Sequence, residues 1–229
     1  MTAIFPRFRA VADQAILVEF SDFIHDDSHA QVLSLDAKLA QFPCVGFTEA
    51  VPAYVSLLVA FDAMLTDHEA IERALRSLIS GPTQPAKQGI LRDIEVCYDI
   101  DIAPDLVAVA QQTGLDPKAV ITAHLAQTYH VVMYGFAPGY AYLGGLPPTL
   151  HLPRKASARR GVPAGSVIIA GAQCLITTLT MPTGWWIIGR SPTHILLDDP
   201  ARPFLFDVGD TVRFKRIDRA AFDAGSGSR

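Results

Sequence analysis

Short apolar segments separated by glycine and proline fill the second half of the chain, and they constrain its fold more than any other feature. From residue 129 onward they include YHVVMYGF, SVIIAG, QCLITTLT, WWIIGR, THILL and TVRFKRI. Short strands with turn residues between them and few helices are typical of an antiparallel barrel or sandwich. Two short helices precede them, one from Pro104 to Gly114 and one capped by Asp116. We therefore predict a β-rich domain over residues 90–220.

The first 85 residues have a different pattern. Runs of β-branched and aromatic residues predict strands at 15–20, 45–53 and 54–61. Apolar residues at helical spacing predict two helices, one capped by Asp27 or Ser28 and one that begins with a capping box at Thr66. The order strand, helix, strand, strand, helix needs one further strand to complete a ferredoxin-like α/β domain. The fold class of the whole chain is therefore α+β.

A linker separates the two regions. Residues 81–89, GPTQPAKQG, contain two glycines and two prolines and have no apolar periodicity. We place one domain at 1–85 and the other at 90–220. The chain ends in AGSGSR, which predicts a flexible tail over 221–229.

Composition narrows the class of protein. Half of the 229 residues are hydrophobic and 18% are charged, as in globular proteins. A net charge of −4 argues against nucleic acid as a partner. The sequence has neither an apolar run of about 20 residues, which a membrane span needs, nor a signal-peptide layout. We expect a soluble cytoplasmic protein whose three cysteines are free thiols, and we predict no metal site, because no metal-ligand spacing is present.

The stretch from His124 to Arg190 is the candidate functional region. No Asp or Glu occurs between Asp116 and Asp198. A glycine-rich, cationic surface without competing carboxylates is suited to binding an anion. The cationic residues cluster in one loop, at Arg154, Lys155, Arg159 and Arg160.

Three residues are the candidate catalytic groups. His124 could act as an acid or base near neutral pH, or it could be a core or capping histidine. Arg154 and Arg159 could bind a carboxylate or phosphate with two hydrogen bonds, or they could belong to a solvated basic loop. A general base is missing from this stretch. Asp99, Asp101, Asp198 or Asp199 could fold in, but we favour a base supplied by a partner.

Glycine, proline and aromatic residues surround these groups and are the candidate binding residues. Glycines allow close backbone approach to a ligand, aromatic rings can stack on it, and backbone amides near VPAGSV could form an anion nest. The set comprises Tyr129, Gly135, Phe136, Pro138, Gly139, Tyr142, Gly165, Ser166, Gln173, Trp185 and Arg190.

Four segments carry a resemblance to a known family. They are GFAPGYAYLGGLP, LPRKASARRGVPAGSVIIAG, GWWIIGR and GDTVRF. In this order they resemble the family variously called the 5-oxoprolinase B subunit, KipI or allophanate hydrolase subunit 1. They are also similar to the first half of the carboxyltransferase domain of urea carboxylase, which spans its subdomains C and D.

The resemblance implies a small N-terminal α/β domain and a C-terminal cyclophilin-like β-barrel. It also implies an activity: one component of an enzyme that converts 5-oxoproline to glutamate at the expense of ATP. Two alternatives stay open. One is half of a carboxyltransferase that uses carboxybiotin, as in urea carboxylase, and the other is a KipI-like inhibitor of a sensor histidine kinase.

The same resemblance implies partners. The expected one is a homologous second subunit, of the type known as the 5-oxoprolinase C subunit, KipA or allophanate hydrolase subunit 2. The 5-oxoprolinase A subunit is a further candidate. ATP would then be a substrate of the complex rather than a cofactor bound to this chain alone.

Overall fold

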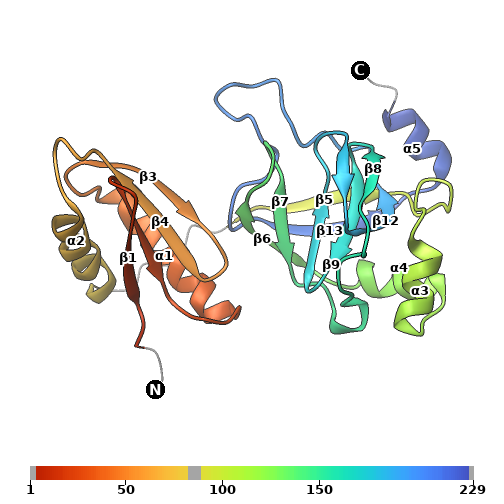
Figure 1. Ribbon diagram of the computed structural model, residues 1–229. Helices are drawn as coiled ribbons and strands as arrows, with labels where there is room; N and C mark the ends of the chain where they lie inside the picture. The colour runs from red at the N-terminus through yellow and green to blue at the C-terminus, as the bar shows by residue number, and fades with distance from the viewer. Residues whose placement is uncertain (1–3, 82–88, 227–229) are drawn as a thin grey trace. The chain divides into compact units, whose positions relative to one another are not determined.

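A computed structural model of the protein describes residues 4–81 and 89–226. The chain divides into two compact units, Met1–Gln88 and Gly89–Arg229 (Figure 1). Most of the predicted linker, residues 82–88, lies outside the described residues. Within the described residues, no helix is both long and apolar enough to cross a membrane.

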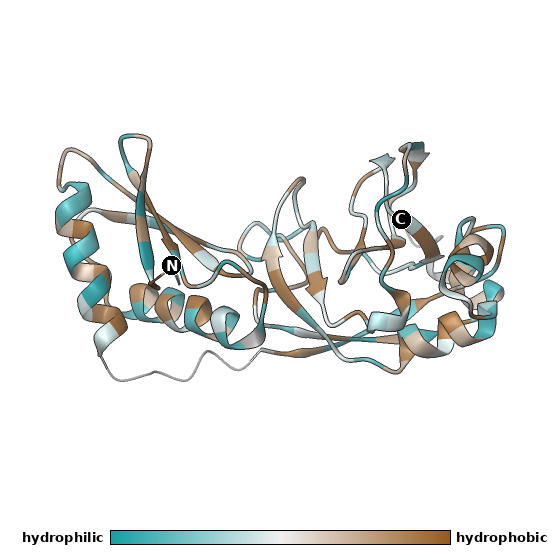
Figure 2. Ribbon diagram, turned by 60° about the horizontal axis from the view of Figure 1, so that its bottom comes forward, coloured by the Kyte–Doolittle hydropathy of each residue, from teal (hydrophilic) through white to brown (hydrophobic). Residues whose placement is uncertain are grey.

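The first unit is a four-stranded antiparallel sheet with two helices. Its spatial order is β1-β2-β4-β3. The helices pack a buried apolar face against the sheet, including Val32, Leu35 and Leu75, and Figure 2 shows the alternation of hydrophilic and hydrophobic residues along α2. The elements are β1 (Arg7–Val11), β2 (Ala15–Glu19), α1 (Asp26–Gln41), β3 (Phe47–Pro52), β4 (Ser56–Phe61) and α2 (His68–Ser80).

The three predicted strands and both predicted helices are present, but two details differ. The N-caps are His25 for α1 and Asp67 for α2, whose side chains accept hydrogen bonds from backbone amides of the first helical turn. The sequence prediction missed β1, which pairs with β2 at the edge of the sheet. A ferredoxin-like domain would fill that edge with a strand that follows α2, so this part of the prediction is not confirmed.

The second unit contains a seven-stranded sheet that curls into a nearly closed barrel. Its order is β12-β9-β10-β7-β6-β13-β5. The two edge strands approach each other where Cys97 and Arg190 exchange two backbone hydrogen bonds, each of 2.9 Å. The strands are β5 (Leu91–Val96), β6 (Tyr129–Tyr134), β7 (Ala141–Gly144), β9 (Ser166–Ala170), β10 (Gln173–Ile176), β12 (Trp186–Arg190) and β13 (Thr211–Arg216).

The predicted barrel is therefore confirmed, although β5 pairs parallel to β13. A separate two-stranded sheet pairs β8 (Arg159–Val162) with β11 (Met181–Thr183). The 3-10 helix η1 (Pro148–Leu150) follows β7.

Among the described residues, three α-helices accompany the barrel. The two predicted ones are α3 (Leu106–Thr113) and α4 (Pro117–Leu125), and they lie together in Figure 1. Gly114 ends α3 in the left-handed conformation, with φ of 71°, and the side chain of Asp116 caps α4. The third is α5 (Arg219–Ser226), which buries Phe222. Residues 221–226 are therefore helical, which corrects the prediction of a flexible tail over this part of the chain.

Candidate functional site

His124 lies inside the barrel rather than at its surface. Its side chain is fully buried, and its ring stacks on Phe214 with centroids 4.5 Å apart. The Tyr98 hydroxyl lies 2.8 Å from Nδ1, and the Cys174 sulfur lies 3.4 Å from Nε2. The Tyr129 hydroxyl donates to the His124 carbonyl oxygen at 3.0 Å.

Burial decides the charge of this histidine. Loss of hydration lowers the pKa of His124 to about 3, so the imidazole is neutral at physiological pH. Burial also raises the pKa of the Cys174 thiol and of the Tyr129 hydroxyl. This position gives no support to a catalytic role for His124 or a binding role for Tyr129. Both side chains pack and hydrogen-bond within the core.

The basic loop is partly neutralised by a carboxylate that the sequence argument overlooked. Asp105, just before α3, is buried, and its Oδ2 lies 2.6 Å from the Lys155 ammonium. Its Oδ1 lies 3.4 Å from the Arg159 guanidinium, and Oδ2 also accepts from the Ile187 amide at 2.9 Å. Lys155 thus ties the loop to the barrel, and Arg159, which is about half exposed, also lies beside this carboxylate. The nearby negative charge weakens the case for Arg159 as an anion-binding residue.

Arg154 belongs to a group of aromatic residues. Its guanidinium lies 5.7 Å from the centre of the Trp185 ring. Ring contacts then run from Trp185 to Tyr142, Tyr140 and Phe136, with centroid separations of 6.0, 5.8 and 5.4 Å. Trp185 and Tyr140 are buried, and burial raises the pKa of Tyr140 to about 12. The structure thus brings together four of the predicted residues, although Trp185 serves mainly the core.

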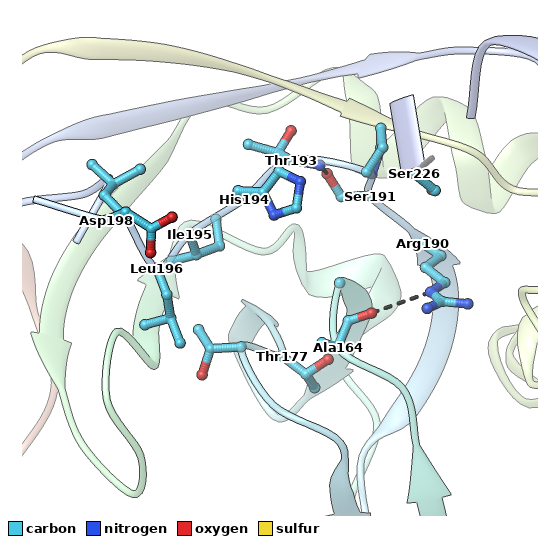
Figure 3. Close-up of a pocket in the computed structure, with 14 residues that line it drawn as sticks. Ala164, Thr177, Arg190, Ser191, Thr193, His194, Ile195, Leu196, Asp198 and Ser226 are labelled. Atoms are coloured by element: carbon cyan, nitrogen blue, oxygen red, sulfur yellow. Dashed lines mark hydrogen bonds between the residues drawn. The ribbon is translucent and has the colours of Figure 1, made fainter. Parts of the chain in front are cut away.

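A cavity of about 760 Å³ opens at the end of β12 (Figure 3). Its walls come from two turns, from the segment that begins at the end of β12 and from the end of α5, all within the barrel unit. The charged and polar side chains that line it are Thr177, Thr178, Arg190, Ser191, Thr193, His194, Asp198 and Ser226.

The geometry of the cavity depends on close backbone packing. Gly165 has φ of 81°, and a Cβ there would lie 2.4 Å from the Ser191 carbonyl oxygen, so only glycine fits. The Arg190 side chain donates from Nε to the Ala164 carbonyl oxygen at 3.2 Å. Figure 3 shows Arg190 and Asp198 on opposite sides of the cavity. One cationic group and one anionic group therefore face a space lined by hydroxyl groups.

Only two of the predicted binding residues, Gly165 and Arg190, line this cavity. Sequence reasoning missed its threonines, its serines and His194, and it preferred a base from a partner over Asp198. The only signal for His194 and Asp198 was their position at the end of the acid-free stretch. Among residues 4–81 and 89–226, no group of three or more His, Cys, Asp or Glu side chains is arranged to hold a metal ion.

The remaining predicted residues border the cavity or lie away from it. Gly139 packs against its wall, since a Cβ there would lie 2.8 Å from Leu196. The Pro138 carbonyl oxygen accepts from the Thr178 hydroxyl at 2.8 Å. Ser166 is buried, and its hydroxyl donates to the Pro163 carbonyl oxygen. Gly135 follows β6 and Gln173 begins β10, and neither lines the cavity.

Comparison with known proteins gives a consistent relationship. Residues 6–206 match the family described as the carboxyltransferase domain, subdomain C and D. A relative from Bacillus subtilis (strain 168), named as the B subunit of 5-oxoprolinase, is 33% identical over 230 residues. The match covers 93% of this chain and 94% of the relative.

Solved structures agree in fold. The crystal structure of TTHA0988 superimposes with a TM-score of 0.79 and 34% identity, over 90% of this chain and 40% of that one. The chain thus spans less than half of that protein's length. The crystal structure of the K. lactis urea amidolyase gives a TM-score of 0.77 over 95% of this chain and 15% of that one. At 18% identity this second likeness concerns the fold alone.

Proposed function

Since this chain belongs to the family of the carboxyltransferase domain, subdomain C and D, we propose that it is one subunit of a 5-oxoprolinase. The reaction would convert 5-oxoproline, ATP and water to glutamate. The observation that carries the proposal is the 33% identity, over 93% of the chain, to a protein named as the B subunit of 5-oxoprolinase.

The cavity at the end of β12 suits this substrate. 5-Oxoproline carries one carboxylate and one cyclic amide. The guanidinium of Arg190 can bind the carboxylate, and the hydroxyl groups of the cavity can hydrogen-bond the amide. Its volume of about 760 Å³ also leaves room for a second reactant.

A second subunit would complete the site. His194 and Asp198 are exposed at the cavity, and Arg190 supplies its positive charge. The name of the relative denotes one subunit of an enzyme. We therefore assign substrate binding to this chain. On the open side of the cavity we place ATP and the homologous partner, of the 5-oxoprolinase C subunit or KipA type.

Reconstitution tests the proposal. The purified chain is mixed with the homologous second subunit, the 5-oxoprolinase A subunit, ATP and 5-oxoproline, and glutamate is measured. Glutamate should form in the full mixture and fall to background when this chain or ATP is omitted. Absence of glutamate, with every component shown to be folded, would overturn the proposal.

The family name supports one alternative, a carboxyltransferase half. The matched family is described as a carboxyltransferase domain, and the urea amidolyase shares the fold. A parallel reaction with a carboxylated biotin carrier and urea separates the two activities. Transfer of the carboxyl group to urea, without glutamate formation from 5-oxoproline, would favour the alternative.

A further inference from the structure

Phe136 is both strained and exposed. Its φ is 71°, in the left-handed region that bulky side chains rarely adopt. Its side chain is 75% exposed. A glycine at this position would relieve the backbone strain and would expose no apolar ring to water. The strain and the exposure of Phe136 therefore do not stabilise the fold.

The loop around Phe136 is firmly braced. The Gly135 amide donates to the Tyr140 carbonyl oxygen at 3.2 Å, and the Ala137 amide donates to that of Gly135 at 2.9 Å. Gly139 packs against Leu196, and Thr178 holds the Pro138 carbonyl oxygen. The exposed ring is therefore presented on a rigid support, and this rigidity lowers the entropy lost on binding.

The surface near this loop has a definite character. Phe136 lies 5.4 Å from Tyr140 at one end of the aromatic group, and Arg154 is exposed at the other end. Pro138 is exposed beside it. An exposed aromatic ring and an exposed arginine are typical of a protein interface centre.

We propose that Phe136 is the anchor by which this chain docks on its second subunit. The partner would offer an apolar pocket for the ring and carboxylates that face Arg154. The identification of the partner rests on the proposed function, whereas the docking surface itself rests on the strain, exposure and bracing of the loop.

A protein partner fits better than a small ligand. Phe136 is not among the residues that line the cavity, although its loop borders the cavity through Gly139 and Pro138. Docking at this ring would therefore place the partner at the mouth of the cavity, where the proposed reaction needs it.

The test compares three variants of the full chain. Phe136→Gly relieves the strain and removes the ring, and Phe136→Leu keeps an apolar side chain. Phe23→Ala is the matched control, because Phe23 is 78% exposed but lies in the first unit. The dissociation constant of each for the purified second subunit is measured by calorimetry, together with the melting temperature.

We expect Phe136→Gly to weaken assembly at least tenfold while the melting temperature stays equal or rises. Phe136→Leu should weaken assembly less, and Phe23→Ala should bind as the parent does. Unchanged assembly in Phe136→Gly would overturn the docking proposal, and so would a parent chain that does not bind the second subunit. Unchanged assembly with a raised KM for 5-oxoproline would assign the ring to a ligand instead.

These outcomes separate the two proposals. A parent complex that assembles through Phe136 but makes no glutamate would refute the 5-oxoprolinase activity and leave the docking site intact. Glutamate formation that does not depend on Phe136 would refute the docking site and leave the 5-oxoprolinase activity intact.

Discussion

The barrel unit holds two regions rich in groups that commonly serve catalysis, and only one of them can meet a ligand. The interior region, around His124, contains an imidazole, a thiol and two phenols, all buried. The cavity region, around Arg190, contains a guanidinium, an imidazole, a carboxylate and several hydroxyls that line an open space. The residue types overlap, and what separates the regions is access to water.

This comparison shows why residue type alone misleads. In the interior, desolvation keeps His124 neutral, and its ring nitrogens are paired with other protein groups. At the cavity, Arg190 and Asp198 lie beside a space that a substrate can enter. The predictions below test this division, from the largest expected effect to the smallest.

The largest effect concerns the pH dependence of stability. The pKa of His124 is about 3 in the folded state and about 6.5 when unfolded. Between these values the unfolded state binds the extra proton, so acid favours unfolding. The free energy of unfolding should fall by about 1.4 kcal/mol per pH unit, or about 4 kcal/mol from pH 6.5 to 3.5.

The free energy of unfolding at each pH can be measured by tryptophan fluorescence during urea unfolding. The signal reports on the barrel unit, because Trp185 and Trp186 are the only tryptophans in the sequence and both belong to it. His124→Leu should flatten the slope in this window, and His194→Leu, at the exposed cavity, should retain it. An unchanged slope in His124→Leu would mean that the interior histidine is already accessible to protons.

The second effect concerns the ion pair at the basic loop. Asp105→Asn leaves the mostly buried Lys155 ammonium without its counter-charge. We expect a loss of about 3 kcal/mol in the free energy of unfolding. The double variant Asp105→Asn with Lys155→Met should recover part of it, and Asp198→Asn at the cavity should cost little. Equal losses in the two aspartate variants would contradict the difference between the regions.

The smallest effect concerns substrate binding. Arg190→Gln should raise the KM for 5-oxoproline about tenfold, equivalent to about 1.4 kcal/mol, because one charge-assisted contact is lost. Its backbone bridge to Cys97 is untouched by the change. Arg160→Gln is the control, since Arg160 is exposed and lies outside the cavity lining. A larger rise in KM for Arg160→Gln would return the anion site to the basic loop.

Most of the fold follows from local sequence patterns. Apolar runs between turn residues located most of the strands, and helical spacing located the helices, because burial imposes those patterns. The prediction missed the short strands β7, β8 and β11. It also gave THILL as a strand, where the structure has only an isolated bridge between Leu196 and Phe204. β1 and α5 were missed as well. β1, RFRAV, carries two arginines and has no buried residue, so it lacks the apolar alternation of a strand. α5 lies in a segment rich in glycine and serine, and it is held by Phe222 and by an ion pair between Arg219 and Asp101.

The candidate site was less predictable, since it depends on contacts between distant residues. The acid-free stretch suggested an unopposed cationic loop, but Asp105 reaches Lys155 across 50 positions. Two residues of the same stretch that were predicted to bind a ligand, Arg190 and Gly165, do line the cavity. Glycine is required at 165 because its turn packs closely against Ser191. His194 and Asp198 reach the cavity only through the path of the chain after β12, which no local pattern specifies.

The most direct test of the account is the fate of isotopically labelled 5-oxoproline. Carbon-13 NMR can follow the substrate in a mixture of the second subunit, the 5-oxoprolinase A subunit, and ATP, before and after this chain is added. We predict that labelled glutamate appears only after the addition, and more slowly with the Arg190→Gln variant. Glutamate at the full rate without this chain, or none after its addition to folded components, would contradict the central claim.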